Sequence, residues 1–118
     1  MGENMQIHYL EIVCPNPKDT SETLSTLHNV TFEGPNALFG NAYMAKMPNG
    51  SRLGVRAPMH ETETPVTRPY FLCSDIKTAI KTLEARGALI MHPPLEIPGE
   101  GTFAIYMEND IQYGLWEI

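Results

Sequence analysis

Three of the four arginines fall where they could bind an anion. Arg52, Arg56 and Arg68 lie in strand-like stretches, on the face opposite to the apolar residues. A planar guanidinium can donate two parallel hydrogen bonds to a carboxylate or phosphate, and aromatic rings can stack on an apolar part of the same ligand. The predicted ligand-binding residues on this face are Tyr9, Arg52, Arg56, Arg68, Tyr70, Tyr106 and Trp116, and the face also carries Lys46, Ala104 and Gln112. The alternative is that the arginines are solvated or ion-paired and that Trp116 belongs to the core.

Glu11 is the one carboxylate on that face, and it follows Tyr9 by two residues. A carboxylate among tyrosines can act as a general base, as epimerase or lyase chemistry requires. An ion pair with Arg56 or Arg68 would instead keep Glu11 chemically inert. Glu11 is therefore the candidate catalytic residue, with both interpretations open.

Other reactive residue types lack the spacing that their chemistry requires. His60, Glu61 and Glu63 are close in sequence and could hold a metal, but a surface loop is the simpler interpretation. Cys14 and Cys73 have no metal-ligand or redox spacing and are expected to be reduced. Neither a catalytic triad nor a glycine-rich phosphate loop is recognisable. The residues therefore predict no cofactor.

The length and charge of the chain limit its class. At 118 residues it matches one domain on the usual scale of roughly 100 to 200 residues. A net charge of -6 argues against a nucleic-acid partner, because phosphate binding needs a cationic face. Residues 1–10 lack the pattern of a targeting signal, and no stretch is apolar enough to span a membrane. We expect a cytoplasmic protein with neither nucleic acid nor membrane as a partner.

Strands and helices that could position these side chains alternate along the chain. Apolar periodicity and turn residues predict two helices, at residues 18–28 and 75–86. The Asn49-Gly50 pair predicts a hairpin, whereas residues 33–36 read as a loop and residues 58–67 as a linker. The predicted strands are residues 7–14, 41–47, 51–57, 68–74, 88–91, 102–107 and 112–118.

The chain repeats itself once. Matching pairs 59 residues apart are Cys14 with Cys73 and Leu24 with Leu83, and pairs 60 apart are Met47 with Met107 and Gly54 with Gly114. A near-constant offset is typical of duplicated modules. We expect one domain, residues 1–118, with a first module at about 5–57, the linker 58–67 and a second module at about 68–118. A ferredoxin-like domain, with only two strands between its helices, is the alternative.

The duplicated order and two C-terminal segments resemble the vicinal oxygen chelate superfamily. These segments are SDIKTAIKTLEARGALIMHPP and PPLEIPGEGTFAIYMENDIQYGLWEI. The superfamily includes glyoxalase I, bleomycin-resistance proteins, fosfomycin-resistance enzymes and extradiol dioxygenases. The resemblance covers nearly the whole chain and is weakest in the first helix. It implies an α+β fold in which two tandem βαβββ modules form a curled mixed sheet, a cup, with the helices outside.

The metal site of the superfamily does not carry over. Metal-dependent members have ligands on the first and last strands of each module, and the matching positions here are Tyr9, Gly54, Arg68 and Gly114. None is His, Asp or Glu, and an arginine repels a cation. His8 is one residue away, but a slip that aligned it would also turn Leu10 into the cup. We expect that the ancestral metal site is lost.

The resemblance implies small-molecule binding, or a metal-independent enzyme with Glu11 as the general base of a lyase-like or isomerase-like reaction. The ligand expected in the cup is anionic or amphipathic. Two alternatives stay open: a metal-dependent lyase or dioxygenase of the same superfamily, and a non-catalytic dimeric sequestering or sensor module. Uncovered sheet edges also predict a homodimer.

Overall fold

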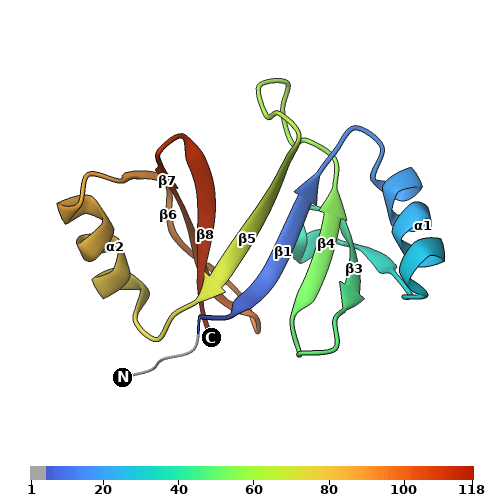
Figure 1. Ribbon diagram of the computed structural model, residues 1–118, viewed down its shortest axis with the longest axis horizontal. Helices are drawn as coiled ribbons and strands as arrows, with labels where there is room; N and C mark the ends of the chain where they lie inside the picture. The colour runs from blue at the N-terminus through green and yellow to red at the C-terminus, as the bar shows by residue number, and fades with distance from the viewer. Residues whose placement is uncertain (1–4) are drawn as a thin grey trace. The chain divides into compact units, whose positions relative to one another are not determined.

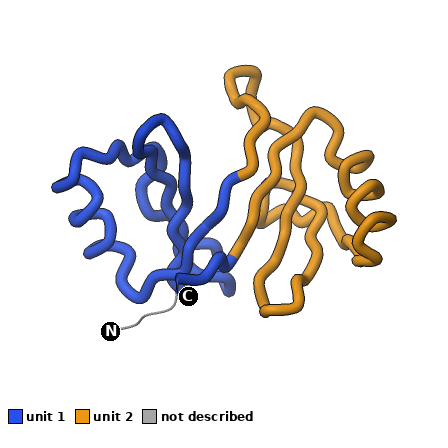
Figure 2. The backbone as a smooth tube through the Cα atoms, viewed as in Figure 1, with its two compact units in different colours: residues 1–8, 68–118 blue, residues 9–67 orange. Residues whose placement is uncertain are grey.

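Residues 5–118 form eight β-strands, two α-helices and one short 3-10 helix (Figure 1). The computed structural model describes residues 5–118, so residues 1–4, on which part of the targeting prediction rests, lie outside it. Two compact units are present (Figure 2): unit 1 is the chain up to His8 together with Arg68–Ile118, and unit 2 is Tyr9–Thr67. The α+β class and the repeated βαβββ pattern are confirmed. No helix in the described part of the chain is long and apolar enough to cross a membrane.

Unit 2 contains one four-stranded layer in the order β2-β3-β4-β1. β1 runs parallel to β4, and β3 is antiparallel to β4 and β2. Its helix begins where the Asn16 side chain accepts a hydrogen bond from the Asp19 amide, as an N-cap should. The elements are β1 (Ile7–Val13), α1 (Pro17–His28), β2 (Glu33–Asn36), η1 (Ala37–Phe39), β3 (Ala42–Lys46) and β4 (Arg52–Arg56).

Strand register fixes which side chains share a face in unit 2. Tyr9 pairs with Arg52, which also pairs with Lys46, so the three form one row across β1, β4 and β3. Glu11 is two residues along and therefore shares their face. The Cys14 thiol, of opposite parity, contacts Thr20 of α1. The predicted polar face thus lies on the side of the sheet away from α1.

Unit 1 repeats the arrangement with the strand order β5-β8-β7-β6. Asp75 caps α2 through the Thr78 amide. The apolar stripe of α2 packs on Ala104 and Leu115, with Ile76 buried between them. The elements are β5 (Val66–Leu72), α2 (Ile76–Ala85), β6 (Leu89–Ile97), β7 (Gly101–Glu108) and β8 (Ile111–Glu117).

The prediction that Tyr106 and Ala104 lie on the same face as the arginines is wrong. Both residues pack in the cluster under α2, and the Tyr106 ring stacks on Tyr113 with centroids 5.2 Å apart. The cause is the tight turn between β7 and β8, which pairs Tyr106 with Tyr113 and Met107 with Gln112. Directly opposed residues share a face, so Gln112 shares its face with Met107 and not with Tyr106.

Two strands differ from the sequence prediction. Residues 33–36, predicted as a loop, form β2 by pairing irregularly with β3. β6 continues through Pro93 and Pro94, beyond the predicted strand at residues 88–91. Because β6 is an edge strand of unit 1, its prolines cost no hydrogen bond to a second neighbour.

Candidate functional site

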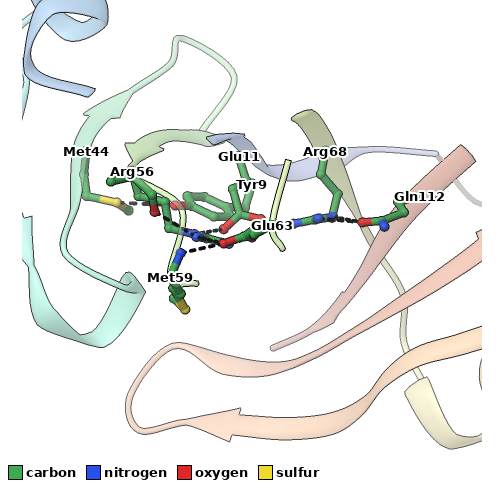
Figure 3. Close-up of polar contacts among 9 residues, drawn as sticks. Tyr9, Glu11, Met44, Arg56, Met59, Glu63, Arg68 and Gln112 are labelled. Carbon is green, nitrogen blue, oxygen red and sulfur yellow. Dashed lines mark hydrogen bonds and ion pairs between the residues drawn. The ribbon is translucent and has the colours of Figure 1, made fainter. Parts of the chain in front are cut away.

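One arginine joins two carboxylates in unit 2. Arg56, at the end of β4, donates from Nε to Glu11 Oε2 at 2.7 Å, from Nη1 to Glu63 Oε1 at 2.9 Å and from Nη2 to Glu63 Oε2 at 2.6 Å (Figure 3). The side chains of Arg56 and Glu11 are only 6% and 8% exposed. Of the two interpretations of Glu11, the ion pair with Arg56 is therefore present, and a catalytic role for Glu11 stays a prediction.

The two carboxylates keep the Arg56 guanidinium charged. Burial acts to lower the pKa of Arg56, but the hydrogen bonds that it donates to Glu63 and the charge of Glu11 outweigh this effect, so the pKa is raised above its ordinary value. Removing one partner of such a buried ion pair is strongly destabilising, because it leaves an uncompensated buried charge. The sequence marks Glu63 only as a possible metal ligand in a surface loop and does not predict its contact with Arg56.

Tyr9 fills the space beside Gly54. A side chain at Gly54 would overlap the Tyr9 hydroxyl. The same hydroxyl donates to the Met44 sulfur at 3.7 Å, and the Tyr9 ring packs on Phe39 with centroids 5.2 Å apart. Tyr9 and Gly54 are two of the four positions matched to metal ligands. The Tyr9 ring therefore stands at one of these positions and fills the space at the other.

His8, one residue away from a matched ligand position, is also engaged in packing. His8 packs its ring against Trp116, with centroids 5.3 Å apart. Among residues 5–118, no group of three or more His, Cys, Asp or Glu side chains is arranged to hold a metal ion. The described residues thus offer no ligand cage.

We expect the buried Tyr9 phenol to make stability fall in alkali. Burial, and then the charge of Glu11, raise the pKa of Tyr9, with smaller opposing effects of Arg56 and Arg52. Above about pH 10 the unfolded state releases this proton first, so the free energy of unfolding falls by up to about 1.4 kcal/mol per pH unit. Denaturation at pH 9 to 11.5 should show a shallower fall for Tyr9→Phe, and equal slopes would contradict the prediction.

A groove in unit 2 lies next to Arg52 and Lys46. Its volume is about 800 Å³, and it is bounded by the end of α1, by β2 and by parts of β3 and β4. The Arg52 guanidinium lies 4.9 Å from the centre of the Phe39 ring, a cation–π contact that fixes its direction. Of the described residues that line the groove, Glu33 is the one with a carboxylate. Arg52 is thus a predicted ligand-binding residue that borders an open space.

Two predicted binding residues of unit 1, Tyr70 and Trp116, pack against each other. Trp116 is 1% exposed and donates from Nε1 to the Glu100 carbonyl at 2.9 Å, so it is a core residue as the alternative interpretation held. Tyr70 packs edge-on against Trp116 and fills the space beside Gly114.

Arg68 belongs to unit 1 as well. It is buried and donates to Gln112 Oε1 from Nε at 3.2 Å and from Nη2 at 2.6 Å (Figure 3). The structure thus joins Arg68 to a neutral amide, on the face where the sequence places both residues.

The fold is shared with solved proteins of low sequence identity. A hypothetical protein from Bacillus halodurans C-125 matches with a TM-score of 0.77 and 11% identity over 98% of this chain and 96% of its own. A Streptomyces coelicolor methylmalonyl-CoA epimerase variant in complex with 2-nitronate-propionyl-CoA gives 0.69 and 15% over 95% and 96%. The methylmalonyl-CoA epimerase of Mycobacterium tuberculosis gives 0.68 and 13% over 92% and 85%.

Sequence comparison adds no closer relative. No family model matches the chain, and no curated protein matches it. The structural matches nevertheless cover nearly the whole length of both partners, and they agree with the duplicated modules and the C-terminal segments read from the sequence. The chain has the fold of the vicinal oxygen chelate superfamily.

Proposed function

We propose that the protein binds a small anionic, amphipathic molecule in the groove of unit 2. The observation that carries the proposal is the row of Arg52 and Lys46 beside a groove of about 800 Å³. That volume falls within the range of about 300 to 1,000 Å³ that is typical of ligand sites. Phe39 already orients Arg52, so little side-chain entropy is lost when an anion binds.

Other groups predicted to bind the anion support the proposal less. Arg56 is held by Glu11 and Glu63, and Arg68 donates to Gln112. Tyr106 faces α2. The proposal therefore concentrates on Arg52, with Lys46 as a second and more exposed cation.

A coenzyme A thioester is the ligand class to test first. The groove lining combines the two cations with apolar side chains such as Val30, Pro35 and Met44. A thioester of this kind carries anionic phosphates at one end and an acyl group at the other. Epimerases that share the fold are described in complex with 2-nitronate-propionyl-CoA and with methylmalonyl-CoA. The match of ligand chemistry to lining supports this choice.

A metal-independent isomerase or lyase, with Glu11 as its base, is the enzymatic form of the proposal. Glu11 faces Arg56, so such a reaction would require a substrate that reaches the ion pair. The absence of a ligand cage from the described residues favours this form over a metal-dependent lyase or dioxygenase. A sequestering or sensor module would show the same binding without turnover.

Calorimetry with coenzyme A, acetyl-CoA and propionyl-CoA tests the binding. Arg52→Ala should weaken binding about tenfold to a hundredfold, because a hydrogen bond to a charged group is worth about 1.5 to 3 kcal/mol. Lys46→Ala should have a smaller effect, since exposed charges are screened. Lys81→Ala on the outer surface of α2 is the matched control. Equal losses in all three variants, or no binding of any of these ligands to the native protein, would refute the proposal.

We also propose that the chain acts as a single-domain homodimer in the cytoplasm. β2 and β6 stand at the two ends of the strand order, and β6 exposes Leu89 and Leu95. Edge strands with exposed apolar residues are suited to a symmetric partner. Both cysteines are free thiols, which supports a reducing compartment.

A further inference from the structure

The side chain of Glu63 binds Arg56 as a carboxylate ligand would. Its two oxygens accept parallel hydrogen bonds from the two terminal nitrogens, at 2.9 and 2.6 Å (Figure 3). This is the two-pronged geometry by which arginine recognises free carboxylates. The third donor, Nε, is already used by Glu11 at 2.7 Å. The terminal nitrogens therefore form a recognition fork whose direction Glu11 fixes.

The carboxylate in the fork comes from a largely exposed loop. Residues 57–65 connect β4 to β5, and the neighbours Glu61, Thr62 and Thr64 are exposed. Glu63 is the exception, with a side chain only 14% exposed. One of its oxygens also accepts the Met59 amide at 2.7 Å, so the loop folds around this single side chain.

The loop is also held at a second point, the Met59 side chain. The end of this side chain fills the space beside Gly40, where any larger residue would meet it. Met59 is nevertheless 63% exposed, so its contact is a partial cover. To leave the fork, the loop would have to break the Glu63 contacts, the 3.1 Å hydrogen bond from Arg56 Nη1 to the Ala57 carbonyl and the Met59 contact beside Gly40.

We propose that the fork of Arg56 is a binding site for a small monocarboxylate, and that Glu63 is its intramolecular occupant. An external carboxylate takes over the two hydrogen bonds of Glu63 and releases residues 57–65. The site is separate from the groove beside Arg52 and does not depend on the proposed function. Its ligand class is an aliphatic monocarboxylate such as acetate or propionate.

Charge selects a monocarboxylate over a phosphate. Arg56 contributes one positive charge, and Glu11 lies within 2.7 Å of it with one negative charge. A monocarboxylate reproduces the charge that Glu63 now supplies. A phosphate dianion would add a second negative charge beside Glu11, in a buried place where like charges repel strongly.

Because Glu63 belongs to the same chain as Arg56, its carboxylate would keep the fork occupied in the native protein. A carboxylate on the same chain has an effective concentration in the millimolar range or above, so it outcompetes dilute ligand. Removing the Glu63 carboxylate should open the fork to free acetate. Acetate therefore reports on the site directly, without knowledge of the physiological acid.

The test compares Glu63→Ala with Glu61→Ala, which removes the same charge from an exposed position of the same loop. Melting temperatures are measured in sodium acetate, propionate, phosphate and chloride at equal ionic strength. Glu63→Ala should melt below the native protein, and acetate or propionate should restore most of the loss with saturation in the millimolar range. The native protein and Glu61→Ala should respond to acetate no more than to chloride.

Nitrogen-15 spectra of the arginine side chains give a second readout. Acetate should shift the Arg56 signals of Glu63→Ala and leave the exposed Arg86 unchanged. If Glu63→Ala does not fold, Glu63→Gln, which keeps one acceptor, is titrated in its place and should show a weaker shift of the same signals. An acetate response that chloride reproduces, or one equal in Glu61→Ala, would overturn the proposal, and a phosphate response as large as that of acetate would overturn its charge argument.

Discussion

Arg56→Met is expected to lower the free energy of unfolding by about 3 to 5 kcal/mol, the usual cost of removing one partner of a buried ion pair. The substitution takes away a guanidinium that lies 2.7 Å from Glu11 and 2.6 Å from Glu63. Both side chains are largely buried, so water replaces the lost hydrogen bonds poorly. Urea denaturation followed by circular dichroism measures the effect.

Two further variants separate charge from volume in this experiment. The double variant Glu11→Leu with Arg56→Met should recover part of the stability, because it removes the unpaired charge of Glu11 and leaves only that of Glu63. Arg86→Met, at the exposed end of α2, should change stability by less than about 0.5 kcal/mol. A loss at Arg56 no larger than at Arg86 would mean that the ion network contributes nothing to the fold.

Gly114→Ala is expected to cost about 1 to 3 kcal/mol, because it overfills a packed region. The new methyl group would overlap the Tyr70 ring near its base, where the ring cannot turn aside without moving the chain. Tyr70 is itself confined by Trp116 and Phe103, with ring centroids 5.8 and 6.0 Å away. Thermal unfolding monitored by circular dichroism should show a clearly lower melting temperature.

A double-mutant cycle identifies the cause of this loss. In a Tyr70→Leu background the same Gly114→Ala change should cost much less, because the smaller side chain vacates the space. Gly99→Ala is the comparison for backbone effects alone. Its φ is +78° and nothing lies near its missing side chain, so only conformational strain is added. Equal costs of Gly114→Ala in both backgrounds would contradict the steric explanation.

Local chemistry is enough to predict most of the elements. The Asn49-Gly50 turn gives the β3–β4 hairpin, and the apolar stripe that includes Ile76, Ile80 and Leu83 gives α2, because turn residues and periodicity act over a few positions. The duplicated modules are indicated by matching residues at a near-constant offset, such as Cys14 with Cys73 and Gly54 with Gly114. A repeat constrains the topology more strongly than any single segment does. The resemblance to a known fold can therefore be recognised from the sequence.

The faces and partners of the candidate site were decided by tertiary structure. A one-residue difference in pairing turned Tyr106 toward α2, because side chains alternate strictly along a strand. Glu11 and Arg56 are 45 residues apart, and Glu63 reaches them only because its loop folds back. The sequence by itself determined that Arg52, Arg56 and Glu11 lie on one face of unit 2. Long-range packing decided that Arg56 forms ion pairs with carboxylates and that Arg52 borders a groove. Electrostatic partners depend on distance in space and not on distance along the chain.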